Sequence, residues 1–230
     1  MNASGTWKPW KRQPAFYLVA LLLLLALALL TAIHDRGWMV LWFADHRSAF
    51  LNQFFTLANY LGDGWFIAVV VLAAGAVRLR NLISLAAATI VTALVVQFLK
   101  RVVFHDIVRP SVYFGQMGVP LDVIDGVALH SYFSFPSGHA AGAFALFLGL
   151  ALLRAGVFTG VVCAIAAMIA GLSRVYLGQH FAADVIAGAV ISVLIVSAIF
   201  MWFRSSAWYR KTWAKYSLLT VFLRAEKKIT

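Results

Sequence analysis

The sequence predicts an all-α, polytopic membrane protein: a six-transmembrane-helix bundle with an N-terminal interfacial segment and a basic C-terminal tail. Three observations support this class. Of the 230 residues, 63% are hydrophobic and only 12% are charged, and the mean hydropathy is +0.89. A soluble domain has roughly a quarter charged residues, and a disordered chain has more charge and less hydrophobicity than this one. We therefore expect a single membrane-embedded domain over residues 1–230.

Six apolar runs account for the predicted spans, because a spanning helix needs about 20 mostly apolar residues. They are Phe16–Ile33, Gly64–Val77, Leu82–Leu99, Ala140–Leu153, Val157–Leu172 and Val185–Phe203. Basic residues precede the first run, so a cleaved signal peptide is an alternative. Since Thr31–His34 is a poor cleavage site, we expect this run to be retained as the first spanning helix. The mixed segment Asp35–Asp63 suits a short interfacial helix and loop.

Charge placement predicts the orientation. The formal net charge is +11, which in a soluble protein would suggest nucleic acid. Here an inside N-terminus puts 13 of the 19 Lys and Arg residues on the inner side, so we expect both termini in the cytoplasm and no nucleic-acid partner. The basic, aromatic tail after Arg204 suits a surface helix on anionic headgroups. With Cys163 as the single cysteine, no intrachain disulfide is possible.

The chemistry-bearing residues gather on the opposite, outer side. All six histidines and seven of the eight acidic residues fall in predicted outer loops or at outer helix ends. Ionisable groups near a bilayer are costly and therefore indicate function. Three clusters stand out in residues 100–184. They are Lys100 and Arg101 with Arg109-Pro110, the run Pro136-Ser137-Gly138-His139, and Ser173-Arg174 with His180 and Asp184.

The second cluster is typical of a helix start. Ser137 is a candidate N-cap, and the unpaired N–H groups of the first turn would form an anion site. Gly138 would let a ligand approach the backbone, and His139 would lie beside that ligand. The alternative is a capped helix with an interfacial histidine.

In the third cluster, His180 and Asp184 are four residues apart, so they share a face if the last helix begins near Gln179. A carboxylate on one imidazole nitrogen leaves the other nitrogen as a nucleophile. The alternatives are a structural His–Asp pair or a metal pair with His139 as third ligand. The nearby arginines would repel a metal cation, so we expect no metal.

The remaining candidates are cations. Lys100, Arg109 and Arg174 would neutralise a phosphoryl group if the third and fifth spans end near each other. The alternative is that each snorkels to the membrane interface, as we expect of Arg101.

These residues resemble the membrane phosphatidic acid phosphatase type 2 family. Its second motif, Pro-Ser-Gly-His, stands here as Pro136–His139, and its third motif is matched without a gap by Ser173-Arg174, His180 and Asp184. The family's first motif is a Lys followed by six residues and Arg-Pro, and this sequence departs from that spacing. Eight residues separate Lys100 from Arg109 and seven separate Arg101 from it, and we expect Lys100 to reach the phosphate.

The resemblance implies the role of each matched residue. His180 would attack phosphorus, Asp184 would orient it, and His139 would protonate the leaving group. The phosphoryl oxygens would be held by Lys100, Arg109, Ser137, Gly138 and Arg174. No cofactor is implied.

The resemblance also implies a substrate and a location. The substrate would be a phosphorylated membrane lipid: phosphatidate, phosphatidylglycerophosphate, undecaprenyl diphosphate or lipid A. The protein would lie in a bacterial inner membrane, with its site facing the periplasm. The connection Ser111–Ser134 is either an interfacial element that admits the lipid chain or a packed surface loop.

Two other functions are alternatives to a phosphatase. A lipid-to-acceptor phosphotransferase would need both histidines. An anion or lipid transporter would place charges near the midplane, whereas these charges cluster at one end.

Overall fold

The computed structural model describes residues 7–122, 124, 126–207, 209, 211, 216–217 and 220. Within this part of the chain the regular elements are all helical, which confirms the predicted all-α class. In chain order the elements are α1 (Pro9–Arg12), α2 (Pro14–Ile33), α3 (Trp38–Asp45), α4 (Ala49–Asn59), η1 (Tyr60–Gly62), α5 (Gly64–Val77), α6 (Leu79–Phe98), η2 (Leu99–Val103), α7 (Pro110–Gln116), α8 (Gly138–Leu153), α9 (Val157–Tyr176) and α10 (Ala182–Ser205).

Six of these helices occupy the positions of the six predicted apolar runs. Helices α2, α9 and α10, and α6 together with η2, are long and apolar enough to cross a membrane. Helices α4 and α5, with η1 between them, pass the same test only as a pair bent by 55°. Helix α8 has 16 residues, or about 24 Å at 1.5 Å per residue, which is less than the ~30 Å bilayer core. The described helices therefore give four or five spans by length, and a sixth span through α8 stays a prediction.

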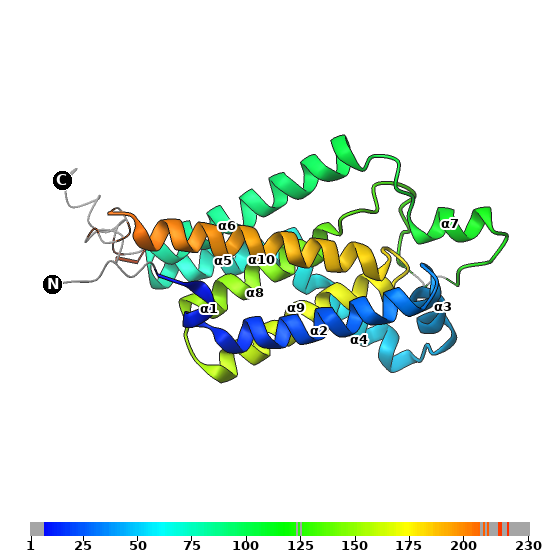
Figure 1. The fold of residues 1–230 in the computed structure, drawn as a ribbon, viewed down its shortest axis with the longest axis horizontal. Coiled ribbons are helices and arrows are strands. Elements are labelled where there is room, and N and C mark those ends of the chain that lie inside the picture. The colour runs from blue at the N-terminus through cyan, green and yellow to red at the C-terminus, as the bar shows by residue number, and fades with distance from the viewer. Residues whose placement is uncertain are drawn as a thin grey trace.

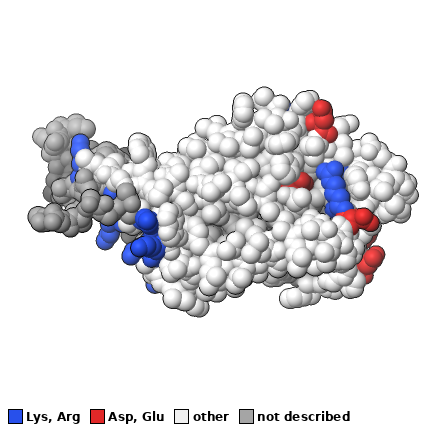
Figure 2. All heavy atoms as spheres, in the orientation of Figure 1, with Lys and Arg blue, Asp and Glu red and all other residues white. Residues whose placement is uncertain are grey.

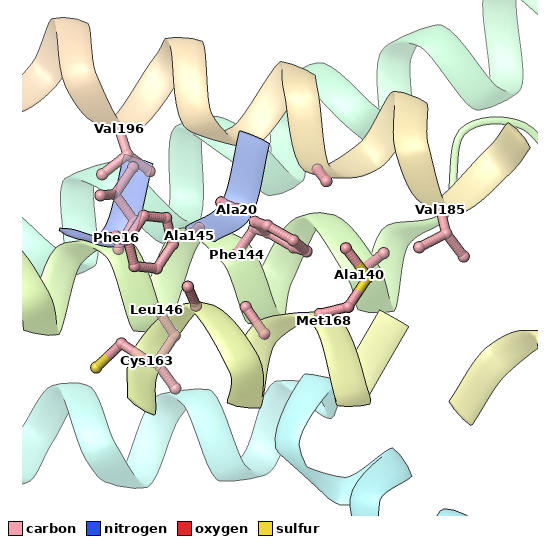
Figure 3. Close-up of a cluster of buried hydrophobic side chains, with 14 of the residues drawn as sticks. Phe16, Ala20, Ala140, Phe144, Ala145, Leu146, Cys163, Met168, Val185 and Val196 are labelled. Atoms are coloured by element: carbon pink, nitrogen blue, oxygen red, sulfur yellow. The ribbon is translucent and has the colours of Figure 1, made fainter. Parts of the chain in front are cut away.

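Helix α8 forms the centre of the bundle. It packs against α6, α9 and α10, and ten of its 16 residues are buried. Phe16 of α2, Phe144 of α8 and Val196 of α10 belong to one buried cluster (Figure 3). The Phe16 and Phe144 rings meet edge to face, with centroids 6.5 Å apart. A helix that is apolar on every side needs such a shell of neighbours, which explains how a short α8 is kept from lipid.

The outer helices expose their apolar side chains instead. Only 17% of the apolar window of α2 is buried, and Leu18, Leu22 and Leu29 are among its exposed residues. In the face shown in Figure 2, Lys and Arg side chains gather at the end that holds α1, Asp and Glu lie toward the other end beside a further basic stretch, and the surface between is nearly uncharged. This distribution suits a protein surrounded by lipid along its length.

Two connections hold more regular structure than the sequence predicts. The segment Asp35–Asp63 forms the two helices α3 and α4 and the turn η1, rather than one short helix and a loop. Ser48 caps α4 through its side chain, and Asp63 caps α5 in the same way. The predicted surface helix of the basic tail lies mostly outside the described residues.

Helices α3 and α7 lie at the end of the molecule opposite α1 (Figure 1). At that end, η2 and the beginnings of α8 and α10 bring together the three sequence clusters. The end of α6 that leads into η2 stands away from the bundle (Figure 1).

Candidate active site

The second and third clusters meet because two helices begin side by side. Ser137 is the N-cap of α8, as predicted, and its Oγ accepts a hydrogen bond from the Ala140 N–H at 3.4 Å. The Ser137 N–H donates to the backbone oxygen of Asp184, in the first turn of α10, at 2.9 Å. A Cβ on Gly188 would lie 2.5 Å from the Ser137 carbonyl oxygen, so glycine is needed for this approach.

The last helix begins at Ala182, three positions after Gln179, where a start would place His180 and Asp184 on one helical face. The difference arises because Gly178 has a positive φ of 66° and turns the chain after α9, so His180 lies before the helix. The predicted pair nevertheless forms: His180 Nδ1 lies 3.3 Å from Asp184 Oδ2. Since both side chains are almost fully buried, the carboxylate holds the imidazole in one orientation.

Ser134, which was not a candidate from the sequence, also contacts this carboxylate. Its Oγ donates to Asp184 Oδ2 at 2.5 Å, and the Phe181 N–H donates to the same oxygen at 3.0 Å. Ser134 is fully buried. It precedes the Pro-Ser-Gly-His run by two positions, and a serine at that distance has no signature of its own.

The two arginines of the site are buried and held by neutral groups. Arg109 Nε donates to the backbone oxygen of Tyr132 at 2.9 Å. Arg109 Nη1 donates to both the backbone and the side-chain oxygens of Gln179 at 3.1 Å. Arg174 donates through Nη1 to Asn59 Oδ1, and its Nε has no hydrogen-bond partner among the described residues. These amides fix the guanidinium groups without neutralising their charge, so both arginines can still bind an anion.

Lys100 and Arg101 differ in position, although they are adjacent. Both lie in the π-helix η2, a widened turn of a type often found at functional sites. Lys100 is buried, and its Nζ would lie 4.0 Å from a Cβ on Gly138. Arg101 is exposed, and its Nε donates to Gln97 Oε1 at 3.3 Å. The widened turn thus accommodates the longer spacing of the first motif and directs Lys100 to the centre, as expected.

A cavity of about 690 Å³ joins these groups. Six of the eight predicted site residues line its polar end: Lys100, Arg109, Gly138, His139, Arg174 and His180. The other two, Ser137 and Asp184, are buried behind this wall. His130 also lines the cavity and was not a sequence candidate.

The cavity continues as an apolar limb between α5 and α6. Its walls include Ile67 and Leu72 of α5 and Leu82 and Ile90 of α6. Leu82 and Lys100 are 18 positions apart, or about 27 Å along a helix. The polar end therefore opens into a passage with the length and the lining that a hydrocarbon chain requires.

Burial and positive charge lower several pKa values here. Burial lowers the pKa of Arg109, although Asp184 opposes the change. Burial, reinforced by Arg109, Arg174 and Lys100, lowers the pKa of His130. Burial also lowers the pKa of His180, although the hydrogen bond that His180 donates to Asp184 opposes this change. His180 is therefore neutral at physiological pH, as a nucleophile must be.

The described residues contain no group of three or more His, Cys, Asp or Glu side chains placed to hold a metal ion. The charged groups that line the cavity are cations, which suits an anionic ligand.

Comparisons with known proteins identify the family of this chain. The family model described as PAP2 superfamily matches residues 81–208, more than half of the chain, so this chain belongs to the PAP2 superfamily. The matched region contains all three sequence clusters. A comparison with curated proteins finds no match.

Two solved structures share the fold. The crystal structure of Aquifex aeolicus LpxE is 24% identical in sequence and aligns with a TM-score of 0.58, over 70% of this chain and 92% of that one. The first transmembrane PAP2 type phosphatidylglycerolphosphate phosphatase from Bacillus subtilis is 22% identical, with a TM-score of 0.55, over 84% of this chain and 96% of that one. Both therefore share the fold of this chain, whose four helices long and apolar enough to cross a membrane indicate a multi-pass membrane protein.

The lowered pKa of His180 predicts a pH dependence of stability. Unfolded histidine takes up a proton near pH 6.5, whereas folded His180 does so only at lower pH. Above pH 6.5 the imidazole is neutral in both states, and the free energy of unfolding is not reduced. Below pH 6.5 the unfolded chain takes up a proton that folded His180 does not, so the free energy of unfolding falls as the pH falls. Between about pH 7 and about pH 5.5, we expect His180→Asn to lose about 1 kcal/mol less stability than the unmodified protein, measured by reversible unfolding in detergent micelles.

The exposed histidine variant His105→Asn controls for the loss of an imidazole. If His180→Asn and the unmodified protein lose stability equally over this range, the folded protein protonates His180 and its pKa is not lowered.

Proposed function

We propose that this protein is an integral membrane phosphatase that hydrolyses the phosphomonoester or diphosphate of a lipid through a phosphohistidine intermediate. The main support is the one cavity that joins His139, His180 and three cations to an apolar limb between α5 and α6. Such a cavity suits a ligand with a phosphate head and a hydrocarbon tail. The B. subtilis structure of the same fold is a phosphatidylglycerolphosphate phosphatase, which agrees with this substrate class.

In the first step, Nε2 of His180 attacks phosphorus, a P–N bond forms, and the bond from phosphorus to the leaving oxygen breaks. Nδ1 is the nitrogen beside Asp184, and Nε2 has no hydrogen-bond partner among the described residues. Asp184 stabilises the positive charge that develops on the imidazole. His139 donates a proton to the leaving oxygen, so the lipid departs as an alcohol or a monophosphate.

In the second step, a water molecule attacks phosphorus and gives its proton to His139. The P–N bond breaks, its electron pair returns to His180, and inorganic phosphate leaves. The same two histidines are thereby restored to their starting states.

The cations stabilise the charge on the phosphoryl oxygens in both transition states. Lys100, Arg109 and Arg174 would contact these oxygens, together with the Gly138 N–H in the first turn of α8. That N–H has no partner among the described residues. Ser137 would contribute by capping α8, which directs the positive end of the helix toward the phosphate. This constellation supplies the positive charge of a metal ion, so the proposed reaction is metal-independent.

We place the active site on the periplasmic side of a bacterial inner membrane and both termini in the cytoplasm. The charge bias of the sequence supports this orientation, and the acidic side chains visible in Figure 2 lie toward the end opposite α1. Phosphatidate, phosphatidylglycerophosphate, undecaprenyl diphosphate and lipid A phosphate all have the required head and tail.

Replacing the nucleophile tests this proposal. We expect His180→Asn to reduce phosphate release from lipid micelles by at least about a thousandfold, because no covalent intermediate can form. His105→Asn, which changes an exposed outer histidine, should retain nearly full activity. Near-normal turnover by folded His180→Asn would refute the mechanism. Transfer of the phosphoryl group to a second lipid, rather than release of free phosphate, would identify a phosphotransferase.

Chelation tests the proposed metal independence. We expect EDTA to leave the rate of phosphate release unchanged within about twofold, because cationic side chains perform the task of a metal ion. Loss of activity in EDTA that a divalent cation restores would overturn this part of the mechanism.

Ser134 is a positioning residue in this proposal, acting through Asp184. We expect Ser134→Ala to lower kcat by about tenfold or more, since a hydrogen bond to a buried charged group contributes about 1.5–3 kcal/mol. KM should stay within about twofold, because Ser134 does not line the cavity. Ser134→Thr should recover part of the rate.

The matched control is Ser192→Ala, which removes a buried hydroxyl that has no hydrogen-bond partner among the described residues. Equal effects of the two alanine variants on kcat would show that Ser134 has only a structural role.

A further inference from the structure

A second polar cavity adjoins the proposed phosphate site. Its volume is about 380 Å³, and it is lined by Gln97, Lys100, Arg101, Arg109, His130, Ser131, Tyr132 and Phe133. Four of these residues, Gln97, Lys100, Arg109 and His130, line the first cavity too. A ligand group in the second cavity would therefore lie directly beside a phosphoryl group bound at His180.

Arg101 is the cation that only the second cavity contains. The Nε donates to Gln97 Oε1, which fixes the base of the guanidinium. Its two terminal nitrogens make no hydrogen bond or ion pair with the described residues. A guanidinium held in this way presents two donors to an anion.

The described residues around this cavity supply no carboxylate that would neutralise its cations. Asp184 accepts hydrogen bonds from Ser134 and Phe181 and lies against His180 on the far side of the first cavity wall. Asp106 pairs with exposed His105 at 2.9 Å, and neither residue lines the cavity. With Lys100, Arg109 and Arg174 assigned to one phosphoryl group, the charge of Arg101 is left for another anion.

The backbone separates the two adjacent cations. Within η2, Lys100 is buried toward both cavities, whereas Arg101 is exposed and borders the second. Arg109 lies in the wall between the cavities, held to Tyr132 on one side and Gln179 on the other. The arrangement provides two neighbouring anion positions that share Lys100 and Arg109.

We propose that the second cavity binds a second phosphate of the lipid substrate through Arg101. This inference rests on the proposed phosphatase function and narrows its substrate class. The preferred substrate is a lipid with two phosphate groups separated by a few bonds, either a polyprenyl diphosphate or phosphatidylglycerophosphate, rather than a lipid with one phosphate. Arg101 then sets specificity rather than merely anchoring η2 at the interface.

The experiment compares Arg101→Gln with the unmodified enzyme on three lipids in the same detergent: a polyprenyl diphosphate, phosphatidylglycerophosphate and phosphatidate. We expect kcat/KM to fall by about tenfold or more for at least one lipid with two phosphates, and by less than about twofold for phosphatidate. The lipid that shows the larger loss identifies the distance between the two phosphates. Arg101→Lys, which keeps the charge, should recover part of the loss.

The matched control is Arg36→Gln, which removes another exposed arginine at the same end of the molecule that lines neither cavity. Equal losses on all three lipids, no loss on any, or an unmodified enzyme that hydrolyses only phosphatidate would overturn the inference while leaving the phosphatase function intact. If the unmodified enzyme and His180→Asn release equally little phosphate from all three lipids, the proposed function itself fails.

Discussion

The contact between the first turns of α8 and α10 is the constraint on which the site depends. The Ser137 N–H is bonded to the Asp184 backbone oxygen, and Gly188 leaves room for the Ser137 carbonyl. This contact places His139, in the first turn of α8, and His180, just before α10, on the wall of one cavity. A side chain at Gly188 would separate the two helix starts and the two imidazoles with them. Packing of small residues thus creates the geometry that the proposed chemistry requires.

The site also maintains an imbalance of charge that is costly to build. Burying a cation without a counter-ion is unfavourable, and the structure reduces this cost with neutral oxygens rather than carboxylates. Asn59 and Gln179 hold the two arginines in this way. The carboxylate of Asp184 contacts His180 instead. An anionic substrate therefore supplies the charge that the folded protein lacks, which couples binding to electrostatic stabilisation.

The shape of the cavity relates this chemistry to the membrane. Its polar end lies among the helix starts, and its apolar limb runs between α5 and the diverging α6. A lipid can keep its hydrocarbon chain in apolar surroundings while its phosphate reaches the histidines, so little of the chain has to enter water. The exposed leucines of α2 and the uncharged belt on the face shown in Figure 2 are consistent with contact with a bilayer.

The sequence by itself determined the apolar helices and the Ser137 cap, and it predicted the residues that we propose carry the chemistry, because hydrophobic runs, caps and motif spacing are local properties. It favoured Lys100 over Arg101 but could not give the physical reason, which is a π-helical turn that buries Lys100 and leaves Arg101 exposed. It gave no signal for Ser134, Asn59 or Gln179, whose hydrogen bonds reach partners 50 to 115 positions away or bridge two loops. It also did not show that Gly178 turns the chain so that His180 lies before α10. Only the tertiary structure decided these points, because they depend on which helix ends meet and on what surrounds each buried charge.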